Sequence, residues 1–382
     1  MSLLDRYITK QYLINVGVLF VLLFAVIIGI DFSLNFDEYV KVADRLNSVA
    51  GNKPSAVHNG ATALYLVFDL WWPRLFLLYN ALLGIILIGA MGFTCAQLNR
   101  HREFVAIMAG GLSLHRVARP IVMTAVVLTA FSALNREVII PRLAPLLTRE
   151  KGEAGLRSLG ETRQPLTSDA QGRLFYAQKV ALDTGRIDGL WAWERDSQGL
   201  MTRRITADSA QWDGTQWVLT NGRAETRQPQ MSASTIPTRT LEAVAALKTD
   251  LDPTALKLRR FEGYANNLST RDLSLLIDNY KGQPQPPLQR IEKYERVRFG
   301  RVAQYASTVL LLLTCLPFYI RREPGNLVVQ TLMSAPVTLV GFVATMVGTS
   351  AAIPGLPPQL SVFIPVMVLI PLAIAAVTSI RT

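Results

Sequence analysis

Residues 11–30 read QYLINVGVLFVLLFAVIIGI, twenty residues without a charge between Lys10 and Asp31. A helix of about 20 mainly apolar residues is long enough to cross the hydrocarbon core of a bilayer. Arg6 and Lys10 precede the run, as they would in a secretory signal peptide, but the run is longer than the apolar core of about 7–15 residues in such peptides. We therefore expect an uncleaved membrane anchor.

Further uncharged runs occur on both sides of a polar middle region. They lie between Arg74 and Arg100, between Arg301 and Arg321, and from Pro324 to Ile380. The last run is long enough for two crossings. We split it at residues 352–358, AIPGLPP, because proline lacks an amide donor and clashes with the preceding helical turn.

A shorter uncharged run, Pro120–Asn135, predicts the third span. It becomes long enough if the span starts near Leu112 and the side chains of Arg116 and Arg119 extend to the lipid headgroups. Six spans result, three before the polar middle and three after it. Composition agrees, since 50% of the 382 residues are hydrophobic and 18% are charged.

The Lys and Arg residues that flank the spans predict the orientation, because short cytoplasmic loops retain these residues. With six crossings the flanking cations share one side: Arg6, Lys10, Arg100, Arg102, Arg116, Arg119, Arg321, Arg322 and Arg381. We expect both termini in the cytoplasm, and a loop from Asp31 to Ala61 and the middle domain on the opposite side. The net charge of +11 is partly this topology signal and does not require a nucleic-acid partner.

The polar middle changes to short alternating segments that are typical of strands. Residues 172–177 and 189–194 are two of them, and residues 205–226 are the clearest. In the last segment, Asp213-Gly214 predicts a two-residue hairpin turn and Asn221-Gly222 a further turn. Short strands with tight turns predict an antiparallel β-sandwich or jelly roll. Trp212 and Trp217 are expected to pack across strands in preference to stacking on a ligand.

The predicted fold is a membrane α-helical protein of six transmembrane helices, three plus three, with an inserted antiparallel β-jelly-roll domain. Residues 1–135 are expected to hold the first three spans, and residues 136–270 the β-domain. Residues 271–382 are expected to hold a linker helix, near Leu273–Tyr280, and the last three spans.

Side chains for catalysis or metal binding are few. The histidines, His58, His101 and His115, have no metal-ligand spacing, and both cysteines, Cys95 and Cys315, fall inside spans, where packing is their expected role. The sequence has no HExxH, no Gly-x-Ser-x-Gly and no nucleotide-binding Gly-x-x-x-x-Gly-Lys-Ser/Thr motif. We therefore expect no catalytic or metal site, and we expect another subunit to supply any energy.

The segment between the second and third spans predicts a short amphipathic helix at about residues 102–111. Phe104, Ile107 and Met108 have helical spacing, and Gly110-Gly111 is a suitable C-terminal stop. One interpretation is an interfacial helix on lipid headgroups, with Glu103 a solvated charge. The other is a coupling helix that fits a cytoplasmic motor, with Glu103 pairing with a basic residue of that motor.

Residues 103–113, EFVAIMAGGLS, resemble the cytoplasmic motif of the lipopolysaccharide-export permeases LptF and LptG. Residues 4–8, LDRYI, resemble the start of these permeases, and residues 353–358, IPGLPP, are similar to their last periplasmic loop. The strand pattern of residues 207–222 resembles their periplasmic β-jelly roll. Each motif is weak alone, but together and in this order they extend over nearly the whole chain.

The resemblance implies a permease subunit of an ATP-driven exporter in the bacterial inner membrane. Such a permease extracts lipopolysaccharide and passes it to a periplasmic β-jelly-roll bridge. The implied partners are a cytoplasmic ATPase like LptB, a second LptF/LptG-type permease, and periplasmic proteins like LptC and LptA. ATP and Mg would be used by the ATPase, and this chain would bind no cofactor. The residues implied in ATPase coupling are Arg102, Glu103, Phe104, Ala106, Ile107, Met108 and Gly111.

The sequence departs from the family near the periplasmic end of the first span. Family members carry basic residues there that are associated with the lipid's phosphates, whereas residues 31–38 here read DFSLNFDE. Lys41 and Arg45 follow, and they are either substitute headgroup contacts or part of a solvated loop.

Two other functions remain open from the residues alone. One is a permease of another ABC class, for lipoproteins or peptides, and the other is a non-transporting receptor or scaffold that presents its external domain. The motifs are shared by LptF and LptG and do not separate them.

Overall fold

The computed structural model describes residues 2–49, 56–147, 162–169, 171–181, 184–195, 200–227, 239–253, 255–256, 262–282, 286, 288–320, 327–353 and 355–380. The chain forms two compact units. The first contains Met1–Gly155, Asn267–Leu273 and Leu288–Thr382, and the second contains Leu156–Asn266 and Ser274–Pro287. Arg321, Arg322, Pro354 and Arg381, which entered the prediction of spans and orientation, lie outside the described residues.

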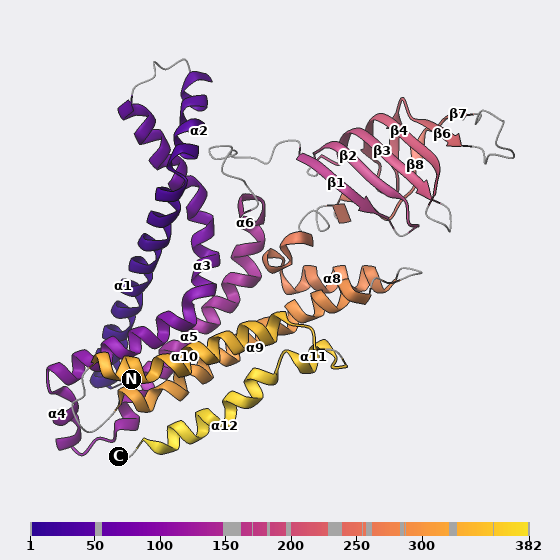
Figure 1. The fold of residues 1–382 in the computed structure, drawn as a ribbon. Coiled ribbons are helices and arrows are strands. Elements are labelled where there is room, and N and C mark those ends of the chain that lie inside the picture. Colours follow the sequence, from indigo (N-terminus) through magenta and orange to yellow (C-terminus); the bar gives the residue numbers. More distant parts are fainter. Residues whose placement is uncertain are drawn as a thin grey trace. The chain divides into compact units, whose positions relative to one another are not determined.

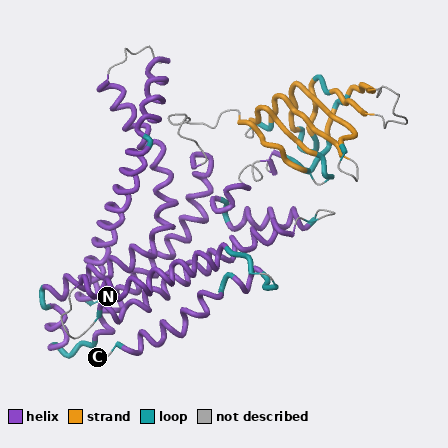
Figure 2. The backbone as a smooth tube through the Cα atoms, viewed as in Figure 1, coloured by secondary structure: helices purple, strands orange, loops and turns teal. Residues whose placement is uncertain are grey.

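The first unit is helical (Figures 1 and 2). Its helices are α1 (Leu3–Leu34), α2 (Phe36–Val49), α3 (Ala56–Arg100), α4 (Glu103–Ala109), α5 (Leu114–Leu134), α6 (Ile140–Leu147), α9 (Leu288–Tyr319), α10 (Leu327–Ser350), α11 (Pro358–Ser361) and α12 (Ile364–Ser379). Among the described residues, six segments are long and apolar enough to span a membrane: Leu3–Leu34, Asn59–Arg100, Leu114–Ala144, Leu288–Tyr319, Val328–Ser350 and Pro358–Ser379. The predicted three-plus-three arrangement of spans is confirmed.

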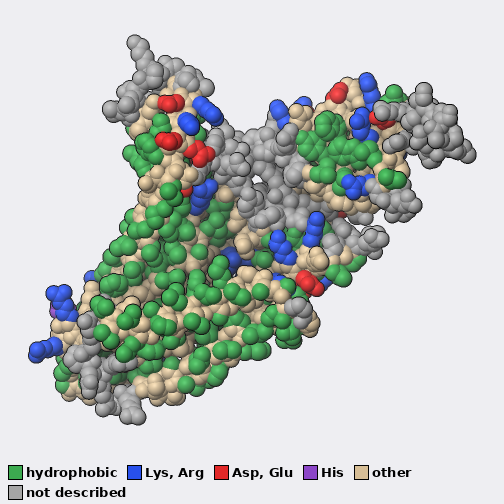
Figure 3. Space-filling view, in the orientation of Figure 1, with side chains coloured by type: hydrophobic (Ala, Val, Ile, Leu, Met, Phe, Trp, Pro, Cys, Tyr) green, Lys and Arg blue, Asp and Glu red, His purple; other side chains and the backbone are tan. Residues whose placement is uncertain are grey.

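The spans pack around α9, which contacts α3, α5, α10 and α12, while α1 packs on α3 and α5. Their shared apolar core includes both cysteines, which are buried free thiols, as predicted. Outside this core the helices present a broad apolar surface, visible in Figure 3, as helices surrounded by lipid would require.

A close approach between α3 and α9 occurs at Gly92. A Cβ atom added there would lie 2.8 Å from the ring of Tyr319, too close for a real contact. The ring is held in place, because the Tyr319 hydroxyl lies 2.6 Å from Ser334 Oγ on α10. Small residues at such positions allow transmembrane helices to pack backbone to side chain.

The third span is longer than predicted. Beyond Leu134 the chain continues through one π-helical turn, Asn135–Ile139, into α6, so helical structure extends to Leu147. The expected start of the β-domain at residue 136 falls inside this helical run, and the first unit extends to Gly155.

The segment from Asp31 to Ala61, expected as the connection between the first two spans, is helical at both ends. α1 continues to Leu34, α2 follows, and α3 begins at Ala56. α2 is amphipathic, and its apolar face forms a core with the start of α3, made of Tyr39, Val42, Ala43, Ala63, Leu66, Val67 and Leu70. Burial of this face stabilises a helical hairpin in a segment whose charges suggested a loop.

The second unit contains an antiparallel sheet of β1 (Thr162–Ser168), β2 (Leu174–Ala181), β3 (Arg186–Arg195), β4 (Met201–Trp212), β5 (Trp217–Thr220), β6 (Arg223–Arg227), β7 (Arg239–Ala243) and β8 (Ala246–Leu247). The strand order is β1-β2-β3-β4-β5-β8, with β6 pairing β4 and β7. The two predicted strands at residues 172–177 and 189–194 are confirmed as β2 and β3. A short 3₁₀ helix, Glu262–Asn267, and α8 (Thr270–Lys281) follow, and α8 confirms the predicted linker helix.

The turn after β4 differs from the prediction. Trp212 pairs with Trp217, so Asp213–Gln216 form a four-residue connection instead of a two-residue turn. The Asp213 carboxylate accepts hydrogen bonds from the backbone N–H groups of Thr215 and Gln216, which favours the longer loop. The two indoles pack edge to face at 5.2 Å, and Trp217 is fully buried, which confirms the expected cross-strand packing.

The alternation of buried and exposed side chains changes phase at the same row of β2, β3 and β4. β2 buries Ala177 and then Val180, β3 buries Ile187 and Leu190, and β4 buries Ala207 and Ala210, three residues apart in each case. The pairing between these strands keeps a constant register at these positions, so the side of the sheet that is buried changes along this row.

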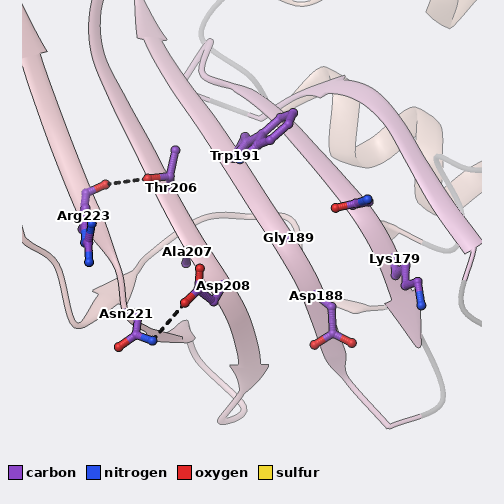
Figure 4. Close-up of a pocket in the computed structure, with 10 residues that line it drawn as sticks. Lys179, Asp188, Gly189, Trp191, Thr206, Ala207, Asp208, Asn221 and Arg223 are labelled. Atoms are coloured by element: carbon purple, nitrogen blue, oxygen red, sulfur yellow. Dashed lines mark hydrogen bonds between the residues drawn. The ribbon is translucent and has the colours of Figure 1, made fainter.

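Gly189, with φ of +68°, lies on this row, and a Cβ added there would lie 3.0 Å from the side chain of Gln178. Both residues line a polar hollow, in which Gly189 lies between Trp191 and Asp188 (Figure 4). Asn221, in the turn between β5 and β6, donates a 2.9 Å hydrogen bond to Asp208 on β4. The hollow therefore lies where the pattern of buried positions changes phase.

Replacing Gly92 with alanine tests the α3–α9 contact. We expect Gly92→Ala to destabilise the detergent-solubilised protein by about 1–3 kcal/mol, because the added methyl group overpacks against the fixed Tyr319 ring. Gly17→Ala is the matched control, since no atom lies within 4 Å of its added Cβ. Thermal unfolding measures both variants, and equal melting temperatures would contradict the close packing.

Candidate functional site

α4 is a seven-residue helix bounded by left-handed backbone at both ends. Arg102, which precedes it, has φ of 57°, and Gly111, which follows it, has φ of +75°. The Gly111 and Leu112 N–H groups donate back to the carbonyls of Met108 and Ile107, closing the last turn. The stop predicted at Gly110-Gly111 is confirmed, and α4 has a fixed length and position.

One face of α4 anchors it to the membrane unit. Phe104 is 3% exposed and belongs to the core shared by the spans, and Ile107 and Met108 pack partly buried against the same core. Val105, Ala106 and Ala109 are exposed, as are Arg102 and Gly111 on either side. The sequence-predicted residues therefore divide into an anchoring set and an outward-facing set.

The carboxylate of Glu103 is held by α1. The hydroxyl of Tyr7 donates a 2.9 Å hydrogen bond to Glu103 Oε1, joining residues 96 positions apart. Further polar pairs continue along the α1–α3 contact, with Gln11 donating to Gln97 and Asn15 donating to both Thr94 and Gln97. Sequence reasoning missed these pairs, although Asn15 and Gln97 were visible as polar residues within or beside spans.

Cations surround α4. At the α4 end of the first unit the exposed basic side chains are Arg6, Lys10, Arg100, Arg102, Arg116 and Arg119. Figure 3 shows Lys and Arg side chains on this end, where α4 and both termini lie in Figure 1. Glu103 therefore places a negative charge within a largely positive surface.

The two candidate headgroup contacts, Lys41 and Arg45, are not in a loop. Both lie on α2 and are exposed, one helical turn apart, so they share a face of that helix. The structure does not bring them near α4, which lies at the other end of the first span.

A carboxylate fixes the joint between α1 and α2. Asp31 accepts hydrogen bonds from Asn35 Nδ2 at 2.9 Å, the Tyr39 hydroxyl at 2.8 Å and Trp71 Nε1 at 3.0 Å. Burial, and then the hydrogen bond to Asp31, raise the pKa of Tyr39, so the phenol stays protonated and remains a donor. The acidic residues of segment 31–38 therefore include one with a structural role.

A second charged cluster lies around the π-helical turn. Arg301 on α9 is 2% exposed, and its Nη1 lies 3.1 Å from Glu137 Oε1. Thr270 donates to the same carboxylate through its N–H and hydroxyl groups, and Arg301 Nη2 donates to the Leu268 carbonyl. Arg136, which precedes Glu137 in the turn, donates to Gln304 at 2.9 Å. Sequence reasoning used these arginines only as ends of spans and missed the cluster.

Comparison with protein families decides the identity. Residues 62–379 match the family model described as lipopolysaccharide export system permease LptF/LptG. The chain belongs to the LptF/LptG family. A comparison with curated proteins finds no match.

Membership establishes a multi-pass membrane protein of the lipopolysaccharide export permeases, which carry no ATPase domain and belong to an ABC transporter system. It favours the export function over the receptor and the other permease classes. The match includes α4 and Arg301, but it begins after α1 and α2, which carry Tyr7, Lys41 and Arg45. Among the described residues, no group of three or more His, Cys, Asp or Glu side chains is placed to hold a metal ion.

The Glu137–Arg301 pair gives a test of the second cluster in this LptF/LptG permease. We expect Glu137→Leu to lower stability by about 3 kcal/mol or more, because it leaves the buried Arg301 guanidinium without its carboxylate. The double variant Glu137→Leu/Arg301→Leu should lose less than Glu137→Leu alone. Thermal unfolding in detergent measures both, with Arg271→Leu as an exposed control, and additive losses would contradict the pairing.

Proposed function

We propose that this permease is one transmembrane half of an ATP-driven lipopolysaccharide exporter of the bacterial inner membrane, and that α4 is its contact with a cytoplasmic ATPase. The observation that carries the proposal is the geometry of α4. It is a short helix between the second and third spans, anchored by Phe104, with Glu103 and Ala106 turned away from the core. The family membership supports an ABC transporter assembly.

The surface charge supports the proposed orientation. The α4 end of the bundle carries six exposed cations next to the spans, and such residues are retained on the cytoplasmic side. Both termini would then be cytoplasmic, and the β-domain would be periplasmic.

The proposed coupling residues have different tasks. Phe104, Ile107 and Met108 hold α4 against the spans, so a push on α4 would reach the membrane helices through them. Arg102, Glu103, Ala106 and Gly111 would form the surface that the ATPase contacts. Glu103 is proposed to pair with a cation of the ATPase, and the exposed Ala106 leaves room for close approach.

A partner permease is proposed to complete the cavity for the lipid. α1 and α10 are the least covered spans, each with only 17% of its most apolar window buried. Extracting an acyl chain costs about 0.8 kcal/mol per CH₂ group, so a lipid with several chains requires an energy source and a sheltered path. The ATPase would supply the energy, and the β-domain with jelly-roll partners like LptC and LptA would continue the path.

The ATPase contact is tested by charge reversal. Glu103→Arg is expected to reduce co-purification of the ATPase subunit at least tenfold and to abolish lipopolysaccharide release from the membrane, because like charges would then meet across the contact. Glu292→Arg, at an exposed acid of α9 outside α4, is the matched control. Normal ATPase binding and normal export by Glu103→Arg would refute the role of α4.

The cargo is tested by crosslinking. A photoreactive residue at Val26 of α1 or at Val340 of α10, both exposed, is expected to capture lipopolysaccharide identified by mass spectrometry. The same residue at Ile374, exposed on α12, is the control for contact with bulk lipid. Recovery of a lipoprotein in place of the glycolipid would overturn the proposed cargo.

The proposed headgroup contacts are tested in the same assay. The double variant Lys41→Glu/Arg45→Glu is expected to lower the yield from Val26 several-fold, because the lipid's phosphates would meet carboxylates. Arg271→Glu is an exposed control outside α2. An unchanged yield would assign Lys41 and Arg45 to the solvated surface.

A further inference from the structure

We infer that Tyr7 is a positioning residue for Glu103, holding its carboxylate in the conformation that the ATPase contact uses. The inference rests on the proposed function of α4. It starts from the 2.9 Å hydrogen bond between the Tyr7 hydroxyl and Glu103 Oε1. Tyr7 lies outside the residues matched by the family model, so the comparison gives it no role.

The two ends of this hydrogen bond are anchored independently. Ile8, the neighbour of Tyr7, is fully buried, and Phe104, the neighbour of Glu103, is 3% exposed. Both belong to the core shared by the spans. The backbone on either side of the bond is therefore fixed, and the hydroxyl meets the carboxylate without a rearrangement of α1 or α4.

Holding the side chain in advance lowers the cost of binding. A free glutamate loses rotamer entropy when it is ordered, and a long side chain on a short surface helix would lose this entropy at the moment of contact. The Tyr7 hydroxyl orders the side chain beforehand through Oε1. No described residue donates to the second oxygen, Oε2, which leaves that atom for the partner.

A neutral donor suits this task better than a cation. Within the described part of the chain, Glu103 makes the hydrogen bond to Tyr7 and no ion pair. This holds although Arg102 precedes Glu103 and Arg6 precedes Tyr7 in the sequence. An arginine at position 7 would neutralise the carboxylate and compete with a cation of the ATPase. A phenol fixes the geometry and leaves the full negative charge in place.

Tyr12, on the same helix as Tyr7, serves as a matched control because its hydroxyl has a different partner. Tyr12, five residues later on α1, donates a 3.0 Å hydrogen bond to the Leu87 carbonyl, inside the α1–α3 contact. Tyr7 is 46% exposed at the α4 end, whereas Tyr12 is fully buried. Removing either hydroxyl deletes one hydrogen bond of α1, but only Tyr7→Phe deletes one that involves Glu103.

A double-mutant cycle tests the inference in the full-length permease, with binding of the system's purified ATPase subunit as the readout. Tyr7→Phe is expected to weaken ATPase binding about three- to tenfold, the range for loss of one hydrogen bond. The same substitution is expected to have no effect in a Glu103→Ala background, because the carboxylate that it positions is gone. Tyr12→Phe is expected to leave ATPase binding unchanged.

The cycle also distinguishes the two ways to fail. Equal losses from Tyr7→Phe in both backgrounds, or no loss in either with Glu103→Ala still weakening the contact, would overturn the positioning role alone. Full ATPase binding by Glu103→Ala would refute the coupling function on which the inference rests. Melting temperatures of all variants, measured in parallel, separate a local effect on the carboxylate from a loss of folded protein.

Discussion

The membrane unit depends on one constraint, that polar groups within the hydrocarbon layer must be satisfied inside the protein. Backbone groups meet it by forming helices, which is why the long uncharged runs become six spans. Several polar side chains meet it by pairing between helices. Asn15 pairs with Thr94 and Gln97, Ser132 and Asn135 donate to Asn80, and Arg301 pairs with Glu137. These pairs fix the rotation of the helices that they join, which apolar packing between similar surfaces specifies weakly.

The same constraint explains what the sequence could predict. Charge-free runs located the six spans, because a charge is costly in lipid unless a partner covers it. The third span was predicted too short for the same reason, since Arg136 and Glu137 were taken as its end. In the fold, partners such as Arg301, 164 positions from Glu137, satisfy these charges, and a helix continues through them. A pairing between distant residues has no local signal in the sequence.

The β-domain also combines features that the local sequence predicts with features that only the pairing of distant strands reveals. Alternation predicted the strands, and turn residues marked their ends, but the change of phase at Gly189 involves three strands at once. Alternation along a single strand does not reveal it, because each strand by itself shows only two consecutive residues that are not buried. Only the register places Lys179, Asp188 and Ser209 side by side and shows that they form one row.

The candidate site likewise depends both on its local sequence and on contacts with distant residues. The motif at residues 103–113 contains its own helix start, anchor and stop, so α4 and the face that it buries follow from adjacent residues. A helix of seven residues is too short to be stable alone, however, and its side chains gain fixed positions only from contacts made elsewhere. The core supplies the contact for Phe104, and the first turns of α1 supply the one for Glu103. Because α1 also continues as the first span, Glu103 is joined to the bundle in two ways, through the aromatic anchor of α4 and through the hydroxyl of Tyr7. The beginning of the chain is therefore part of the surface that α4 presents, although nothing in the local sequence of either segment links them.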